Sequence, residues 1–155
     1  MNATRVASGM GNEAIKVGFW HAVEENNTNP NSHVLLIGNM PPNTLEEVGG
    51  NRSEIGEAYW QTTKFKQVTD YNTPLDPLIS HGVPVHAFYV DRSAQAAFAE
   101  IATRSGGSHG YLDLNAVAAK AVDLLTHAVS ISVLHGIGGH ELSDRYSSKY
   151  GRGYV

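Results

Sequence analysis

Polar residues with binding chemistry gather directly after two apolar runs of the chain. One group follows residues 34–37 and the other follows residues 83–90. Runs that are apolar on both faces are typical of strands buried in a parallel sheet. Open α/β sheets bind their ligands at the carboxyl ends of such strands. We therefore expect a partner-binding site made of Asn39, Met40, Asn43, Asp91 and Arg92.

The second of these groups also has a purely structural interpretation. Asp91, Arg92 and Ser93 stand where a strand turns into a helix, and serine is a preferred helix cap. The pattern alone supports both a binding role and a simple turn, so both remain open.

The sequence gives little support for catalysis. It contains no cysteine, no G-x-S-x-G nucleophile motif and no G-x-x-x-x-G-K-[ST] phosphate loop. Its eight histidines show no spacing typical of metal ligands. We expect no catalytic residue. The alternative is a small Rossmann-like hydrolase or nucleotide-binding protein that uses Asp91 and a histidine.

Helical and apolar extended patterns alternate along the chain, with short links between them. This alternation predicts an α/β fold with an open, mostly parallel, Rossmann-like sheet in three layers. Asn12 is expected to cap the first helix, with Glu13 in its first turn. Thr73 and Ser93 are expected to cap two later helices. The expected strands are 33–38, 84–90 and 110–114, and the expected helices are 13–25, 53–61, 73–81, 93–105 and 116–135.

The chain length of 155 residues suits one domain with a substantial core. We place this domain at residues 1–135. The glycine cluster 136–139 is expected to end the last helix and leave 136–155 as a flexible tail.

Charge and hydropathy limit the expected partners and location. The formal charge is −4, which gives no electrostatic reason to expect nucleic acid or an anionic membrane as partner. The sequence shows no signal peptide and no apolar run of membrane-spanning length. The absence of cysteine agrees with a reducing compartment, so we expect a cytoplasmic protein.

Four segments between residues 8 and 134 occur in an order that resembles the von Willebrand factor A (VWA) domain. They are a glycine-rich loop at 8–13, a strand ending in Gly-Asn-Met-Pro-Pro at 38–42, the strand at 83–90, and Ile-Ala-Thr-Arg-Ser-Gly-Gly at 101–107. The resemblance implies a Rossmann-like sheet that holds a protein partner at the face where the strands end.

The chain departs from the VWA pattern at the family's metal site. VWA domains bind Mg²⁺ or Mn²⁺ through a D-x-S-x-S motif, which this sequence lacks. Asn39 stands where the family has an aspartate, and the glycine-rich loop offers Met10 and Asn12. The resemblance thus implies the C-terminal half of a VWA domain with a degenerate metal site. We expect no cofactor, with Mg²⁺ or Mn²⁺ bound only if another chain supplies the missing ligands.

The missing half leaves the strand at 33–38 at an edge of the sheet. Apolar edge strands are an aggregation hazard that proteins seldom leave open. We expect that the chain is a piece of a longer protein or that another chain completes the sheet. A third alternative is that residues 3–8 fold back as a surrogate strand. The expected function is a non-catalytic protein–protein interaction module, whose partner is another protein or a second copy, so that the chain is oligomeric.

Overall fold

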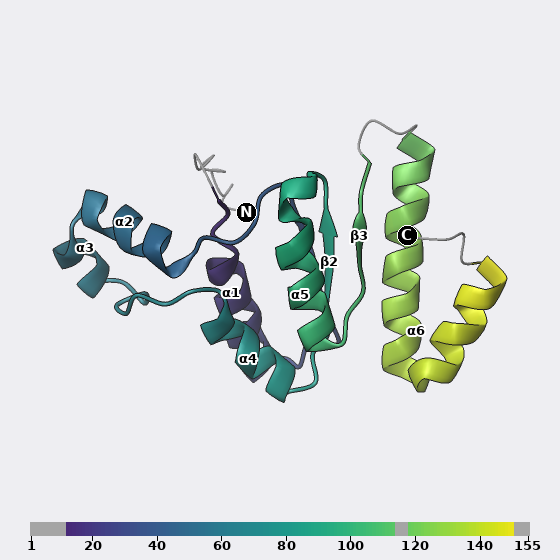
Figure 1. Ribbon diagram of the computed structural model, residues 1–155. Coiled ribbons are helices and arrows are strands. Elements are labelled where there is room, and N and C mark those ends of the chain that lie inside the picture. Colours follow the sequence, from purple (N-terminus) through teal and green to yellow (C-terminus); the bar gives the residue numbers. More distant parts are fainter. Residues whose placement is uncertain (1–11, 114–117, 151–155) are drawn as a thin grey trace.

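The computed structural model describes residues 12–113 and 118–150, which form an α/β structure around an open sheet of three parallel strands (Figure 1). The strand order is β1-β2-β3, and Val34 pairs with Val85 while Ala87 pairs with His109. The predicted order and the parallel direction are therefore confirmed. The strands are β1 Val34–Gly38, β2 Val85–Tyr89 and β3 His109–Tyr111.

The third strand is shorter than expected. Residues 112 and 113 lie outside it, and residue 114 lies outside the described residues. Leu112 still donates its backbone N–H to the Tyr89 carbonyl at 2.8 Å, and the ladder ends there. The helices are α1 Ile15–Thr28, α2 Leu45–Ile55, α3 Glu57–Gln61, α4 Asn72–Ser80, a 3₁₀ turn Arg92–Ala94, α5 Gln95–Ser105 and α6 Ala118–Tyr150.

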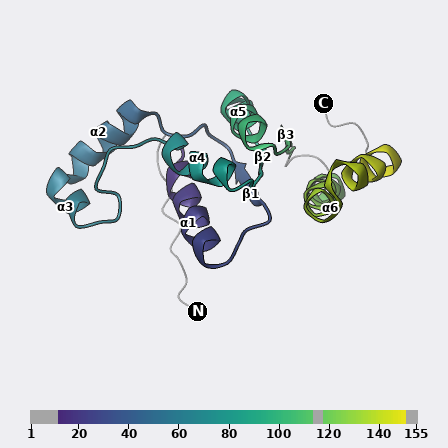
Figure 2. The ribbon, with the colours of Figure 1, turned by 90° about the horizontal axis from the view of Figure 1, so that it is seen from below.

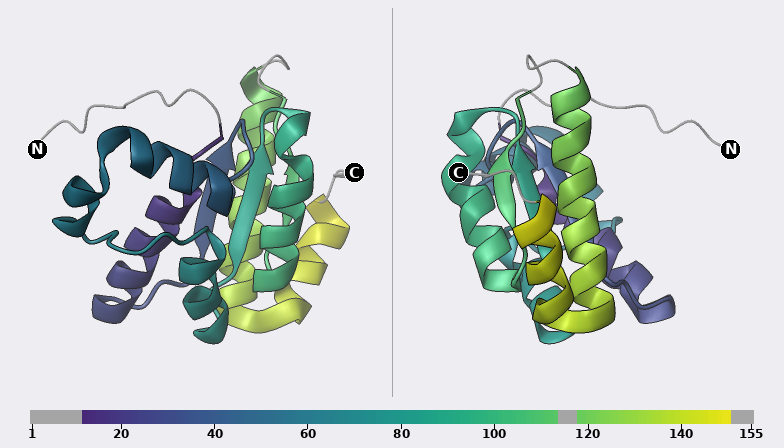
Figure 3. Two further views of the ribbon diagram at one scale, coloured as in Figure 1. Left: turned by 60° about the vertical axis from the view of Figure 1, so that its left-hand side comes forward. Right: turned by 90° about the vertical axis from the view of Figure 1, so that its right-hand side faces the viewer.

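Helices cover both faces of the sheet. On one face α1, α4 and α5 pack against alternate residues of β2 and form the main core, which includes Phe19, Leu75, Phe98 and Ile101 (Figure 2). On the other face a small cluster joins Phe88 to residues of α6, which lies opposite α5 (Figure 3). Every residue of β2 is buried, as expected of a central strand.

The first predicted helix cap is wrong. Helix α1 begins at Ile15, and no side chain caps it. Asn12 instead donates to both carboxylate oxygens of Glu47 at 2.9 Å. Glu13 lies in an extended segment, where its N–H donates to the Pro41 carbonyl at 2.8 Å and it forms a parallel bridge with Pro42. The side chains of Asn12 and Glu13 both form hydrogen bonds with residues more than 25 positions away in the sequence, and helix periodicity cannot predict such partners.

The predicted caps at Thr73 and Ser93 are also wrong, and at both places an aspartate forms the local hydrogen bond. Before α4, whose N-cap Tyr71 makes no side-chain cap bond, Asp70 accepts the Asn72 N–H at 3.0 Å. Asp91, not Ser93, caps the turn before α5, because its carboxylate accepts the Ser93 N–H at 2.8 Å. Asp side chains readily bond the N–H two residues on, and this local geometry prevails at both sites.

Residues 44–72 hold two helices where one was expected at 53–61. The left-handed conformation of Gly56 (φ 99°) separates α2 from α3. Helix α2 has a capping box in which the Thr44 and Glu47 side chains each bond the other residue's N–H. The α2–α3 segment extends away from the sheet (Figures 1 and 2).

The glycine cluster ends the first arm of α6 as predicted, because Gly138 and Gly139 have non-helical backbone angles. A second helical arm then reaches Tyr150, where the sequence predicts a flexible tail. Gly139 has a φ of 64°, which lets the chain turn without unwinding the second arm. The His127 and Tyr146 rings lie 5.1 Å apart, so the two arms pack together (Figure 3). A second arm that buries side chains on the first has a reason to stay helical.

Candidate functional site

The loops that follow β1 and β2 lie in contact. The Val90 N–H donates to the Gly38 carbonyl at 3.0 Å. The Ser93 hydroxyl lies 3.5 Å from the Asn39 carbonyl oxygen and 3.8 Å from the Met40 sulfur. The structure thus brings Asn39, Met40 and the residues around Asp91 to one edge of the sheet, because parallel strands end there together.

Glu13 belongs to this edge, although helix periodicity assigned it to a helix. One oxygen of its carboxylate accepts the N–H groups of Asn39 at 2.9 Å and Met40 at 3.3 Å. A Cβ atom at Gly38 would lie 2.5 Å from the other oxygen, so the Glu13 carboxylate would have to shift if residue 38 carried a side chain. The only sequence signal for this role is the position of Glu13 in the loop that resembles the VWA glycine-rich loop.

Asp91 is a charged acceptor on this surface. Its carboxylate accepts the Ser93 hydroxyl at 2.7 Å and the Ser93 N–H at 2.8 Å. These two hydrogen bonds, with the hydroxyl contributing most, lower the pKa of Asp91. The side chain is exposed and ionised at neutral pH.

Removal of the Ser93 hydroxyl tests this local arrangement. In Ser93→Ala, the pKa of Asp91 should rise toward its ordinary value but stay below it, because the hydrogen bond from the backbone N–H of residue 93 remains. A carboxyl group whose pKa is lowered by folding stabilises the protein above its unfolded pKa, and the contribution disappears as pH falls through the folded pKa. The side-chain carbon shift of Asp91, followed by NMR through an acid titration, measures the change. An Asp91 titration curve identical in both proteins would contradict the assignment.

The other predicted site residues point to different surroundings. The Arg92 guanidinium lies over the Tyr111 ring of β3, 5.2 Å from its centroid. Asn43 and Glu13 both line a hollow between α1 and α2. The five predicted residues therefore occupy one edge of the sheet but do not converge on one point.

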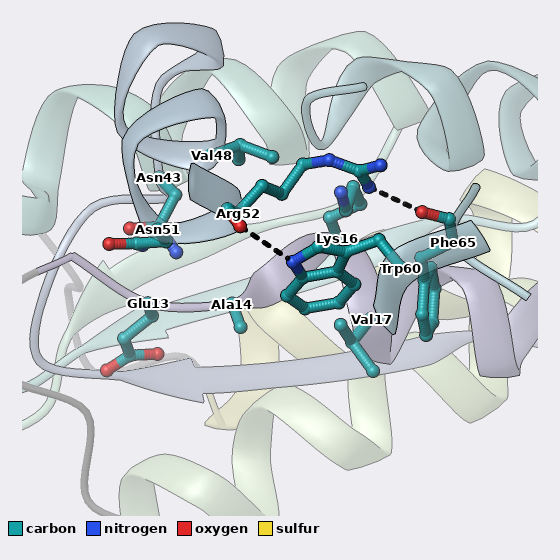
Figure 4. A pocket seen from close by; sticks show the side chains of 10 residues that line it. All are labelled: Glu13, Ala14, Lys16, Val17, Asn43, Val48, Asn51, Arg52, Trp60 and Phe65. Atoms are coloured by element: carbon teal, nitrogen blue, oxygen red, sulfur yellow. Dashed lines mark hydrogen bonds between the residues drawn. The ribbon is translucent and has the colours of Figure 1, made fainter. Parts of the chain in front are cut away.

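The hollow beside Asn43 has a volume of about 110 Å³ (Figure 4). The buried Arg52 and the indole of Trp60 form much of its wall, and Trp60 donates its ring N–H to the Arg52 carbonyl at 3.2 Å. Ligand pockets for drug-sized molecules span roughly 300–1,000 Å³. This hollow is therefore too small for such a ligand.

The residues at the sheet edge do not fit Mg²⁺ or Mn²⁺. Among the described residues, no three His, Cys, Asp or Glu side chains are grouped so that they could hold a metal ion. The Glu13 oxygen that faces Asn39 is already occupied by two N–H groups. A neutral amide at Asn39 adds no charge to offset the dehydration of the cation.

Comparisons of the chain with protein-family models, with curated proteins and with solved structures find no match. The class of protein is therefore defined by the structure itself, whose described residues form an α/β arrangement with an open, all-parallel sheet of three strands. The resemblance to VWA domains stays a prediction. No helix within the described ranges is both long and apolar enough to cross a membrane.

Proposed function

We propose that this chain is a non-catalytic protein-binding module of Rossmann-like, VWA-like layout, which holds its partner along β1 and at the edge where the strands end. The observation that supports the proposal is the open side of β1. Within residues 12–113 and 118–150, β2 is the only strand that pairs with β1. The predicted fold-back of residues 3–8 lies outside the described residues.

The backbone of β1 offers bonding groups on its open side. The Val34 N–H donates to Pro84 and the Gly38 carbonyl accepts from Val90, so these residues face β2. In a parallel ladder, alternate residues bond to opposite sides. Leu35 and Ile37 therefore direct their N–H and C=O groups to the open edge. A strand added by a partner would satisfy these groups.

The side chains of β1 make the same edge apolar. Leu35 is 40% exposed and Ile37 is 44% exposed, whereas Val34 and Leu36 pack against the main core. A strand added at this edge would be stabilised by the burial of these apolar side chains as well as by the backbone hydrogen bonds. The occupant is a second copy or a strand of another protein.

Beyond the end of β1, the partner would meet the exposed polar side chains of the sheet edge. Asn39, Asp91 and Arg92 are exposed, and Met40 and Asn43 are half-buried. We propose that these five residues contact the partner directly and without a metal bridge. The hydrogen bonds of Asp91 go to Ser93. No observation favours its pairing with a histidine in a hydrolase.

A lysine on the open strand should abolish strand addition. Ile37→Lys places a charge where an added strand must pack, whereas Ile55→Lys changes another exposed isoleucine (59%), which lies on α2. Wild type and Ile55→Lys should self-associate with rising concentration, with or without EDTA, and Ile37→Lys should remain a folded monomer. Light scattering coupled to size exclusion measures the masses.

Amide hydrogen exchange separates the proposal from a covered edge. At low concentration the Leu35 and Ile37 amides should exchange much faster than those of Val34 and Leu36, and association should protect them. A wild-type monomer whose Leu35 and Ile37 amides are already protected would show that β1 is covered from within, and the proposal would fail.

A further inference from the structure

A second hollow lies on the outer side of the helix pair α1–α4. It is an open groove of about 430 Å³ between α1, the first turns of α4 and the loop at residues 64–69. Its volume is within the usual range for ligand sites, roughly 300–1,000 Å³. No residue of β1 lines it, so it is separate from the strand edge.

Three lysines line this groove on a chain whose net charge is −4. They are Lys16 on α1, and Lys64 and Lys66 on the loop. Across the described ranges, ion pairs join Arg52 to Glu57 and Arg104 to Asp76 and Glu100, and no carboxylate pairs with these lysines. The groove therefore concentrates positive charge with no internal counterion at pairing distance.

Aromatic rings take the place of carboxylates beside two of the ammonium groups. The Lys64 Nζ lies 4.8 Å from the Trp20 ring centroid, and the Lys16 Nζ lies 5.8 Å from that of Phe65. Such cation–π contacts are electrostatic attractions between a cation and the face of an aromatic ring. They place the two ammonium groups beside apolar rings, although the Lys64 residue is exposed to solvent. The Trp20 and Phe65 rings also contact each other edge to face, 5.4 Å apart.

Lys16 has the strongest reason to accept an anion. Burial of its ammonium group is the main cause that lowers its pKa, and the nearby Arg52 charge lowers it further, with Asp70 opposing both. A carboxylate arriving at this position would offset the desolvation of the cation.

We propose that this groove binds an acidic, extended segment of a partner protein, with carboxylates on Lys16, Lys64 and Lys66 and an apolar side chain on Trp20 and Phe65. Apart from the lysines, its lining includes Val23, Pro74 and Pro77, which suit an apolar side chain. This site is independent of the proposed strand addition at β1.

The charged residues of the groove and the net charge of the chain favour a peptide over nucleic acid as the ligand. Glu24 also lines the groove, and it would face the regular phosphates of a nucleic-acid strand. Nucleic-acid binding depends on basic surface that neutralises many phosphates, which a chain of net charge −4 does not provide in bulk. A peptide can place its few carboxylates opposite the lysines and leave an uncharged residue opposite Glu24.

The test uses the full chain and a synthetic peptide in which glutamate alternates with leucine and phenylalanine, measured by titration calorimetry. A matched peptide with glutamine for glutamate controls for apolar contact. We expect saturable binding of the acidic peptide that weakens with added salt, because the lysines lie near the surface. The double variant Lys64→Glu/Lys66→Glu should bind it at least about tenfold more weakly, which equals roughly 1.4 kcal/mol.

Lys149→Glu is the control for added negative charge outside the groove, with half the charge change of the double variant, since Lys149 lies at the end of α6 and does not line the groove. It should bind within about twofold of wild type, a difference of roughly 0.4 kcal/mol, and so should Ile37→Lys. Equal binding of the glutamine peptide, or unchanged binding by a folded double variant, would overturn the proposal. So would an absence of saturable binding, or tighter binding of a single-stranded oligonucleotide that the double variant loses.

Discussion

Gly107→Ala is expected to destabilise the protein by more than about 3 kcal/mol, a large share of the stability of a typical domain. A Cβ atom at Gly107 would lie 2.0 Å from the Val85 carbonyl oxygen and 2.5 Å from its carbon. Both atoms belong to the backbone of β2, so no side-chain rotation can relieve the clash. The turn is held there by the bond from the Gly107 N–H to the Ala102 carbonyl at 2.8 Å. Either β2 or the end of α5 must therefore move.

Two other glycines separate this clash from general effects of adding a methyl group. Gly106 has a φ of 75° and open space around its Cβ position, so Gly106→Ala should cost about 1–2 kcal/mol from backbone strain alone. Gly18 lies within α1 with open space, and Gly18→Ala should stabilise the helix by about 0.5–1 kcal/mol. Urea unfolding followed by circular dichroism gives the three free energies. If Gly107→Ala costs no more than Gly106→Ala, the close approach to Val85 is wrong.

Arg52→Leu is expected to cost about 2–4 kcal/mol and to unfold the α2–α3 segment first. Arg52 is only 3% exposed and joins three parts of the chain. Its guanidinium donates to the Phe65 carbonyl at 2.5 Å, to the Lys66 carbonyl at 2.8 Å, and to both carboxylate oxygens of Glu57. Leucine fills part of the space but removes the Arg52 hydrogen bonds, so the Phe65 carbonyl loses this donor. Gln61 still donates to Glu57 and to the Lys66 carbonyl.

Arg104→Leu serves as the matched control. Arg104 also pairs with carboxylates, but it is 34% exposed, so its loss should cost at most about 1 kcal/mol. Amide exchange across 45–61 should rise in Arg52→Leu and not in Arg104→Leu. The hydrogen bond from Arg52 is the first cause that lowers the pKa of Glu57, so that pKa should rise toward its ordinary value in Arg52→Leu. Similar effects of both variants would contradict the role assigned to Arg52.

The sheet could be predicted from sequence because its signals are local. The apolar runs at 34–37 and 83–90 are bounded by glycine, proline and polar residues, and both form parallel paired strands, although only β2 is buried along its whole length. Gly106 ended the helix at 93–105 as expected, with φ in the left-handed region. The contact between Asn39, Met40 and Ser93 followed from topology alone, since parallel strands end at one edge.

The remaining features depend on contacts between distant segments. In the sequence, Asn12 and Glu13 resemble the start of a helix. In the structure, Asn12 instead donates to Glu47, and the Glu13 carboxylate accepts an N–H of the segment after β1. The glycines at 138 and 139 are compatible with a flexible tail or with a second helical arm after them, and only the packing of Tyr146 on His127 decides between them. Periodicity carries no information about such partners, so it misplaced both elements.

The pairing register of the sheet also has a consequence in time. Val34 pairs with Val85, whereas Ala87 pairs with His109, so β1 closes a chain loop more than twice as long as the β2–β3 loop. During synthesis at about 5–20 residues per second, β1 is complete several seconds before β2 exists. Throughout that interval β1 lacks the strand with which it pairs in the described residues. The strand that we propose for partner binding is therefore the one with the longest interval between its own synthesis and that of the strand with which it pairs.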